Sequence, residues 1–275
     1  MSGSADPTDA LVGALRAVGC VFAEDEARLL IEAAPPGPER DRLVARRLAG
    51  IPLEHVLGWV EFAGLRIEVD DGVFVPRQRS VLLARLAGDA LAAAAGRAVD
   101  GPSPASDGPA VVVDLCCGSG ALGVAVVSSC ETPVELHAAD LDPAAVACAR
   151  RNLAPLGGVA YVGDLDEPIP ARLAGRVTVL VVNAPYVPSH AVGLMPREAR
   201  EHEAVMALDG GDDGLDLLRR VLRVAPRWLS PGGTVIVELG EGQVDALLDE
   251  ARAVGLDAQV VRDDDLGATA LVATA

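Results

Sequence analysis

The stretch VVVDLCCGSGALG, residues 111–123, decides the fold of this chain. A continuous apolar run that ends in an acid is typical of a central parallel strand. Gly118, Gly120 and Gly123 follow, and glycines at such positions let a backbone turn tightly and approach a ligand. A helix that begins here would present unpaired N–H groups to that ligand. The stretch therefore predicts a strand, a ligand-binding turn and a helix in succession.

Strand and helix patterns alternate from this stretch onwards. The expected strands are 134–140, 159–164, 177–183 and 234–240. The expected helices are 143–156, 213–229 and 242–254, and residues 257–275 are typical of a closing hairpin. Strands interleaved with helices predict an α/β fold with a doubly wound sheet.

Shorter elements precede the glycine-rich stretch. The pattern predicts amphipathic helices over 5–50 with a break at Pro35–Pro38, a β-hairpin over 51–76, a helix over 80–99 and a small-polar linker over 100–109. The hairpin is indicated by alternating apolar residues (Phe62, Leu65, Ile67 and Val69). The Asp71-Gly72 pair is the expected turn between its strands.

The composition suits a packed globular chain and disfavours several other classes. Hydrophobic residues make up 51% of the 275 positions, yet no apolar run approaches the ~20 residues that span a bilayer. The N-terminus lacks a secretory pattern, so we expect a cytoplasmic protein without a membrane partner. The net charge is −17 and all 23 basic residues are arginines, which opposes binding to nucleic-acid backbones. The five cysteines form no CxxC pair, and we expect reduced thiols and no metal site.

Three acids that end consecutive strands indicate which cofactor the glycine turn holds. The G-x-G-x-x-G pattern, with Asp140 about 20 residues further on, leaves a nicotinamide dinucleotide site open. However, two cysteines separate Asp114 from the glycines, and an acid before the turn suits an ammonium group better than a pyrophosphate. Asp140 can accept bonds from ribose hydroxyls, and Asp164 can accept one from an adenine amine. S-adenosylmethionine, a cationic nucleoside without phosphate, fits all three acids.

Further cofactor contacts are expected beside these acids, in the turn and at the strand ends (Cys116, Gly118, Gly120, Leu141, Leu165 and Asn183). The segment NAPY, residues 183–186, ends the strand 177–183, and ligands of open α/β sheets bind beyond such carboxyl ends. The Asn183 side-chain oxygen and the Ala184 carbonyl can accept both hydrogens of a planar nitrogen.

The other two residues of this segment shape the same expected pocket. Pro185 restricts the conformation of Ala184, and the Tyr186 ring can lie against the flat face of the acceptor group. We expect residues 183–186 to be the catalytic site for methyl transfer to an amide or aromatic amine nitrogen.

Taken in order, these motifs resemble those of the HemK/PrmC-type protein-(glutamine-N5) methyltransferases over nearly the whole chain. The similar segments are IPLEHVLGWVEFAGLRIEVDDGVFVPR (51–77), DLCCGSG (114–120), AADLDPAAVACARRN (138–152), NAPY (183–186), EHEAVMALDGGDDGLDLLRRV (201–221) and SPGGTVIVELGEGQ (230–243). The resemblance implies a seven-strand Rossmann-like methyltransferase sheet behind a small helical domain. It places a helical substrate-recognition domain at 1–57, a β-hairpin linker at 58–79 and the S-adenosylmethionine-dependent domain at 80–275.

The resemblance also implies the reaction, which is methyl transfer to the side-chain amide nitrogen of a glutamine in a protein. In the best-known members the substrate is a class I release factor, methylated on the Gln of Gly-Gly-Gln. A release-factor-like protein is therefore the expected partner of a monomeric enzyme.

Three departures from the family pattern concern the substrate more than the reaction. Ala184 replaces the first proline of Asn-Pro-Pro-Tyr, and Leu165 stands where an aromatic residue is common. The stretch PRQRS, residues 76–80, replaces an acidic Pro-Arg-Pro-Glu-Thr-type stretch.

Two other functions remain open on the sequence. An N6-adenine nucleic-acid methyltransferase uses a similar amide clamp, although the net charge disfavours it. A module that only binds S-adenosylmethionine is the second, and retention of Asn183 and Tyr186 argues against it. Arg77 and Arg79 could form a basic lip or pair with surface carboxylates, and Glu238 could contact the cofactor loops or be solvated.

Overall fold

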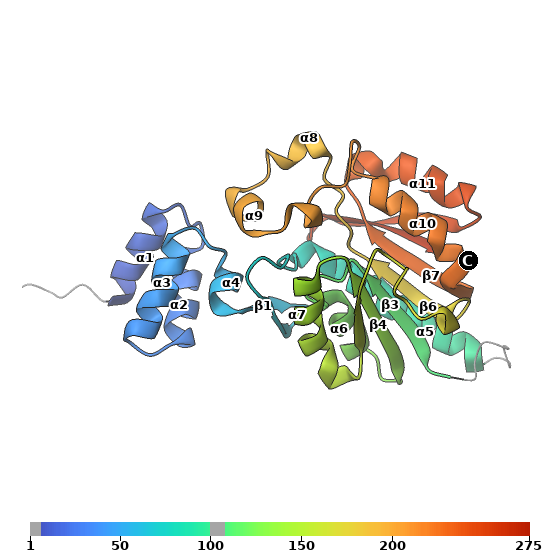
Figure 1. The fold of residues 1–275 in the computed structure, drawn as a ribbon, viewed down its shortest axis with the longest axis horizontal. Coiled ribbons are helices and arrows are strands. Elements are labelled where there is room, and N and C mark those ends of the chain that lie inside the picture. The colour runs from blue at the N-terminus through green and yellow to red at the C-terminus, as the bar shows by residue number, and fades with distance from the viewer. Residues whose placement is uncertain (1–6, 100–107) are drawn as a thin grey trace, which may run out of the picture.

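The computed structural model describes residues 7–99 and 108–275, so most of the expected linker at 100–109 lies outside the described residues. Figure 1 shows a group of helices from the N-terminal part of the chain beside a larger α/β unit, with a short two-stranded ribbon between them. None of the described helices combines the length and the apolar character needed to cross a membrane.

The N-terminal helices pack around a small core of their own. They are α1 (Pro7–Ala17), α2 (Ala23–Ala33), α3 (Pro38–Leu48) and α4 (Leu53–Leu57). Leu15, Leu30 and Val56 are buried together at their centre. Pro38 occupies the first turn of α3, where a missing N–H costs nothing, and this explains the break that the sequence predicts there.

The hairpin forms, but its turn is not the expected one. Its strands are β1 (Trp59–Phe62) and β2 (Leu65–Glu68), and the turn is Ala63-Gly64, where both φ angles are positive. A two-residue hairpin turn of type I′ requires this conformation, and Gly64 adopts it without strain. The prediction of a turn at Asp71-Gly72 is therefore wrong, and the hairpin is shorter than the expected 51–76, because Leu53–Leu57 form helix α4.

The α/β unit is a seven-stranded sheet in the order β5-β4-β3-β6-β7-β9-β8. The strands are β3 (Ala110–Leu115), β4 (Val134–Asp140), β5 (Val159–Val162), β6 (Val177–Val182), β7 (Leu229–Glu238), β8 (Asp257–Asp263) and β9 (Ala268–Thr274). Neighbouring strands from β5 to β7 pair in parallel, whereas β9 runs antiparallel to both of its neighbours. The seven-strand α/β fold is confirmed.

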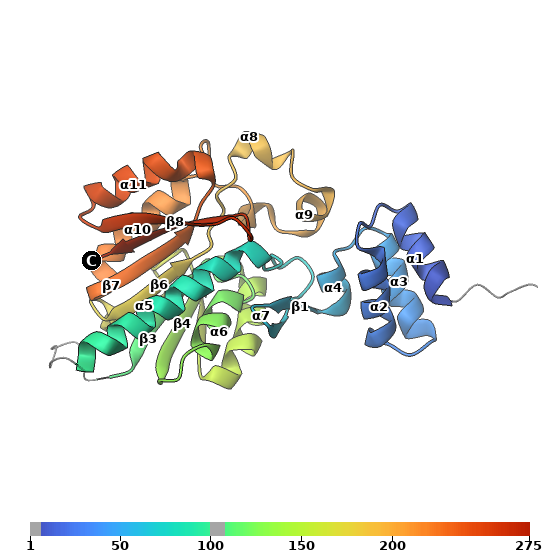
Figure 2. The same cartoon turned by 180° about the vertical axis from the view of Figure 1, so that it is seen from behind.

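Helices cover both faces of this sheet. On one face lie α5 (Val81–Val99), α6 (Ala121–Ser128) and α7 (Pro143–Leu153), and on the other lie α10 (Asp216–Trp228) and α11 (Val244–Ala253). Figure 2 shows α5 running along the sheet on the first face. Strand β3 explains the apolar run, because Val112 packs with the first group of helices while Val111 and Val113 pack with the second. A strand buried on both sides needs apolar residues at every position.

One segment of the α/β unit carries helices that the sequence pattern did not predict. Residues 187–209 form the short helices α8 (Ser189–Val192) and α9 (Arg197–His202). We call residues 187–209 the roof segment. Two further boundaries differ from expectation. Strand β7 begins at Leu229 and includes the SPGG residues, which were expected to separate the helix from the strand. Strand β6 ends at Val182, so Asn183 follows it and is not its last residue.

Candidate active site

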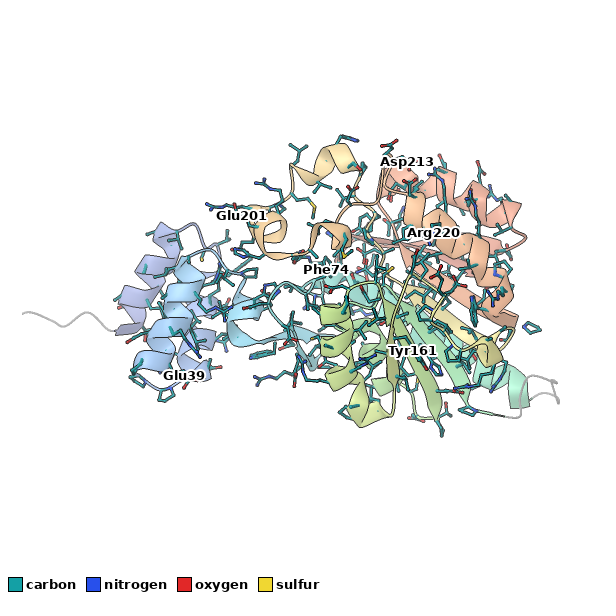
Figure 3. All side chains as sticks on the ribbon, in the orientation of Figure 1. Glu39, Phe74, Tyr161, Glu201, Asp213 and Arg220 are labelled. Atoms are coloured by element: carbon teal, nitrogen blue, oxygen red, sulfur yellow. The ribbon has the colours of Figure 1, made fainter. Side chains whose placement is uncertain are left out.

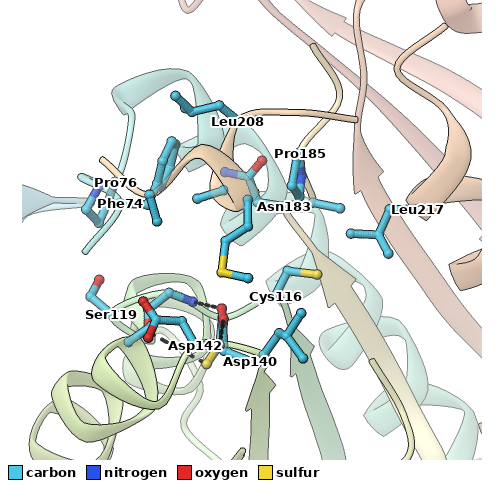
Figure 4. Close-up of a pocket in the computed structure, with 18 of the residues that line it drawn as sticks. Phe74, Pro76, Cys116, Ser119, Asp140, Asp142, Asn183, Pro185, Leu208 and Leu217 are labelled. Atoms are coloured by element: carbon cyan, nitrogen blue, oxygen red, sulfur yellow. Dashed lines mark hydrogen bonds between the residues drawn. The ribbon is translucent and has the colours of Figure 1, made fainter. Parts of the chain in front are cut away.

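A cavity lies at the carboxyl ends of β3, β4 and β6, where the sequence predicts the ligand site. Figure 4 shows Asp140, Asp142 and Ser119 on one side of it, with Asn183, Phe74 and Leu208 on the opposite side. Most of the expected site residues line this cavity (Cys116, Gly118, Asp140, Leu141, Asp164, Leu165, Asn183, Ala184, Pro185 and Tyr186). The fold therefore brings the glycine loop and the NAPY segment to one site.

The glycine loop forms a tight turn beneath the cavity. Cys116, Gly118 and Gly120 all have positive φ angles, of 56°, 53° and 78°. The Gly118 backbone N–H donates to Asp140 Oδ2 at 2.8 Å, which ties the loop to the end of β4. A Cβ on Gly118 would meet no atom within 4 Å, so this residue faces open space.

Gly120 has a packing role in the structure and does not line the cavity. It precedes α6, and a side chain there would collide with Cδ1 of Leu153 on α7. Gly120 therefore differs from Gly118, which faces open space, because its free side is turned towards the neighbouring helix.

Asp114 also lies behind the loop and not at the cavity wall. Its side chain is fully buried, and Oδ2 accepts a hydrogen bond from the Gly123 N–H at 2.9 Å. Burial raises the pKa of Asp114 to about 7, the Gly123 bond opposes this, and the charge of Asp140 adds to it. The predicted direct contact with an ammonium group does not fit this position, although the carboxyl can act on the site through the loop.

The remaining acids sit at the strand ends as expected. Asp140 accepts bonds from the backbone N–H groups of Gly118 and Asp142, and burial raises its pKa. Asp164 accepts a bond from Arg220 Nη2 at 2.8 Å, so an arginine already pairs with it. Arg220 extends from α10, and like Phe74 it lines the cavity; Figure 3 labels both side chains. No sequence pattern pointed to Arg220 beyond its place in an amphipathic helix.

The loop has the properties that a phosphate-free cationic nucleoside requires. Among the described residues, two buried side-chain atoms lack a hydrogen-bond partner, Asp114 Oδ1 and Ser119 Oγ, and both belong to this loop. A pyrophosphate would be opposed by the carboxylates of Asp140 and Asp164, whereas a ribose or an amine would be favoured by them. The residues present therefore fit S-adenosylmethionine.

The NAPY segment holds its side chains through contacts with distant residues. Asn183 Nδ2 donates to Ser80 Oγ at 3.1 Å, and the Tyr186 hydroxyl donates to Glu238 Oε1 at 2.7 Å. Ala184 is buried, with 2% of its surface exposed. Burial raises the pKa of Tyr186, and the charge of Glu238 adds to this. Glu238 is 1% exposed, which excludes the solvated-charge interpretation.

The roof segment forms one wall of the cavity, and two arginines from other elements bind this segment. Met195, Met206 and Leu208 line the cavity from this segment. Arg77 bonds to both oxygens of the buried Glu203, at 2.6 and 2.7 Å. A second pair joins Arg47 of α3 to Glu198 of α9 at 2.7 Å, so the N-terminal helices contact the roof. Arg77 therefore forms an ion pair with a buried carboxylate, which excludes the basic-lip interpretation for this residue.

Comparison with known proteins agrees with the fold. A family model of the methyltransferase small domain matches residues 105–209. The release factor glutamine methyltransferase of Streptomyces coelicolor is 38% identical over 214 residues, which cover 76% of this chain and 71% of that protein. A 4-amino-L-phenylalanine/4-methylamino-L-phenylalanine methyltransferase of Streptomyces pristinaespiralis is 33% identical over 225 residues, covering 81% and 73%.

A solved structure shows the same fold at low sequence identity. The hMettl16 catalytic domain in complex with MAT2A 3′UTR hairpin 6 is similar with a TM-score of 0.54 and 13% identity, over 84% of this chain and 81% of that one.

Fold, site and relatives together define an S-adenosylmethionine-dependent methyltransferase. The choice of this cofactor over a nicotinamide dinucleotide is thereby confirmed. The chain belongs to the release factor glutamine methyltransferase family, as its motifs predict.

Proposed function

We propose that this enzyme transfers a methyl group to the side-chain amide nitrogen, N5, of a glutamine in a protein. The observation that carries the proposal is the position of Asn183 and Ala184 in the same cavity as the glycine loop. An amide nitrogen is a weak nucleophile because its lone pair is delocalised. A site for it needs acceptors for both of its hydrogens, and these two residues provide them.

The chain's residues act by orienting the acceptor amide. When bound, S-adenosylmethionine supplies the electrophilic methyl group. Asn183 Oδ1 and the Ala184 carbonyl accept the two N–H groups of the glutamine, which fixes the nitrogen and favours the developing positive charge. Pro185 restricts Ala184 to an extended conformation and so directs that carbonyl. The Tyr186 ring covers the flat face of the amide. No strong base is needed, because the proton leaves after the methyl group has been transferred.

The cofactor side of the proposal uses the loop and the strand ends. The Gly118 backbone approaches the cofactor, Asp140 accepts from the ribose and Asp164 from the adenine amine. Asp164 acts as part of its pair with Arg220. The aliphatic side chains beside these acids (Leu141 and Leu165) and Cys116 flank the same cavity. Asp114 supports the loop from behind through Gly123.

A release factor is the proposed protein substrate, because several relatives of this chain are release factor glutamine methyltransferases, and the resemblance of the motifs points to class I. We assign substrate recognition to residues 1–57, linkage to 58–79 and catalysis to 80–275, and we propose a cytoplasmic monomer. The net charge of −17 disfavours a nucleic-acid substrate.

A second acceptor is supported by one feature of the cavity. Arg79 lines it, its Nε bonds to Glu238 at 2.8 Å, and its guanidinium carbon lies 5.7 Å from the centre of the Tyr186 ring. A guanidinium at a cavity wall suits the carboxylate of an amino acid. The relative that methylates 4-amino-L-phenylalanine acts on an arylamine, which is also a planar nitrogen. An aromatic amino acid with a ring amine is therefore the second candidate.

Labelled S-adenosylmethionine tests these acceptors side by side. The enzyme is incubated with a purified class I release factor, with 4-amino-L-phenylalanine and with an adenine-containing oligonucleotide, and the products are analysed by mass spectrometry. The proposal expects one added methyl group on a glutamine of the release factor and none on the oligonucleotide. Methylation of the arylamine alone would replace the first proposal by the second. The Asn183→Ala variant serves as the control without an amide clamp.

A further inference from the structure

A chain of hydrogen bonds runs from the amide clamp to a buried carboxylate at the end of β7. Asn183 Nδ2 contacts Ser80 Oγ at 3.1 Å, and Ser80 Oγ donates to Glu238 Oε2 at 2.5 Å. The other carboxylate oxygen, Oε1, accepts from Tyr186 at 2.7 Å and from Arg79 Nε at 2.8 Å. Two side chains of the NAPY segment are thus connected to one carboxylate.

The direction of these bonds follows from the donors that each group carries. A carboxylate paired with an arginine is ionised and can only accept hydrogen bonds. The Ser80 hydroxyl has one hydrogen, and this bond to Glu238 uses it, so only lone pairs of Ser80 face Asn183. The Asn183 atom that faces Ser80 must therefore be the NH₂ group. A side-chain amide can otherwise turn by 180° at little cost in shape.

The consequence lies at the other end of the amide. No hydrogen bond joins Asn183 Oδ1 to another described residue. This oxygen is also not fully buried, because the buried atoms without a partner are Asp114 Oδ1 and Ser119 Oγ. It is therefore free to accept an N–H of the acceptor. If the amide were turned, its NH₂ group would meet the NH₂ group of the substrate, and two donors would oppose each other.

We infer that Ser80 and Glu238 are positioning residues that fix the amide of Asn183 with its oxygen towards the acceptor nitrogen. This inference rests on the proposed function of Asn183. Glu238 also anchors the Tyr186 hydroxyl, so one carboxylate sets both the amide and the ring of the acceptor pocket. The stretch PRQRS thereby gains a role, because its Ser80 supplies the hydroxyl at a position where the family pattern has threonine.

Three substitutions separate orientation from simple packing. Glu238→Gln keeps the shape but adds a donor, which lets Ser80 turn its hydrogen towards Asn183 and release the amide. Ser80→Ala removes the hydroxyl, and Ser80→Thr restores it. We expect kcat to fall roughly 10- to 100-fold in the first two variants and to stay near the wild-type value in Ser80→Thr. The affinity for S-adenosylhomocysteine, measured by calorimetry, is expected to remain within about twofold in all three.

Matched controls lie away from the cavity. Ser129→Ala removes a hydroxyl that bonds only to a carbonyl within α6, and Glu241→Gln alters an exposed ion pair with Arg262. Both controls are expected to keep wild-type kcat. The double variant with Ser80→Ala and Glu238→Gln is expected to lose no more than the worse single variant, because both act through the same amide.

A spectroscopic readout tests the inference without any acceptor. The side-chain NH₂ signals of Asn183 are assigned by comparing ¹⁵N–¹H spectra of the wild type and Asn183→Asp. Glu238→Gln and Ser80→Ala are expected to shift these signals, and Ser80→Thr is expected to restore them. Unshifted signals in Glu238→Gln would overturn the inference, as would kcat within a factor of two of the wild type. If the wild type methylated no glutamine while the signals shifted as expected, the proposed function would fail and the orientation of Asn183 would stand.

Discussion

The carboxyl of Asp114 makes the stability of this enzyme depend on pH in a direction opposite to that of acids whose pKa is lowered by ion pairs or hydrogen bonds. In the folded chain its pKa is about 7, against 3.8 for the ordinary side chain, because burial disfavours the charge. The folded state therefore holds a proton that the unfolded state has already released. The contribution of Asp114 to the free energy of unfolding is fully present below about pH 4, and it is lost as the pH rises through about 7. The difference between the two pKa values corresponds to about 4 kcal/mol, of which about 3 kcal/mol falls between pH 5 and pH 8.

Asp114→Asn isolates this contribution. The amide retains an oxygen that can accept the Gly123 N–H and cannot ionise. Urea unfolding of both proteins at several values between pH 5 and pH 8 gives the free energy of unfolding. We expect wild type minus variant to fall by about 3 kcal/mol over that interval. Asp257→Asn, at an exposed position on β8, is the control and is expected to run parallel to the wild type. Parallel curves for Asp114→Asn as well would refute the reasoning.

Other positions give equally direct tests. Gly120→Ala is expected to destabilise the fold by about 2–4 kcal/mol, because its φ is positive and the new methyl group collides with Leu153, and thermal unfolding measures it. Arg77→Ala leaves Glu203 buried without its partner, and urea unfolding is expected to show a loss of about 3 kcal/mol; an unchanged midpoint would contradict a buried pair. Asn183→Ala is expected to abolish methylation, while calorimetry shows S-adenosylhomocysteine binding without NADH binding; wild-type activity in this variant would exclude the amide clamp.

Local patterns were sufficient to predict the sheet and the position of the cavity. The apolar run of β3 and the glycines behind it depend on neighbours in sequence, and parallel strands bring their carboxyl ends to one edge. The same reasoning failed for the hairpin, where Asp71-Gly72 has the stronger turn composition but the chain turns at Ala63-Gly64. A turn preference is weak, and the register of the strands decided between the two.

The parts of the site that the sequence did not predict depend on contacts between distant segments. Ser80 and Glu238 are 158 positions apart, and no periodicity connects them. The bond of Asp114 depends on where α6 starts, because this places the Gly123 N–H beside its carboxyl. The roof segment has helices too short for a periodic pattern, so its covering of the cavity appears only in three dimensions.

The same separation in sequence bears on the order in which the two halves of the site can form. The cofactor side comes from the consecutive segment 110–165, in which β3 and β4 are each followed directly by a helix. The acceptor side requires residues 79–80, the NAPY segment and Glu238 to meet, and the bond from Ser80 to Glu238 closes a loop of 158 positions. Closing so long a loop costs chain entropy that short-range contacts do not. We expect a partly folded chain to hold a recognisable cofactor loop well before it can discriminate between acceptors.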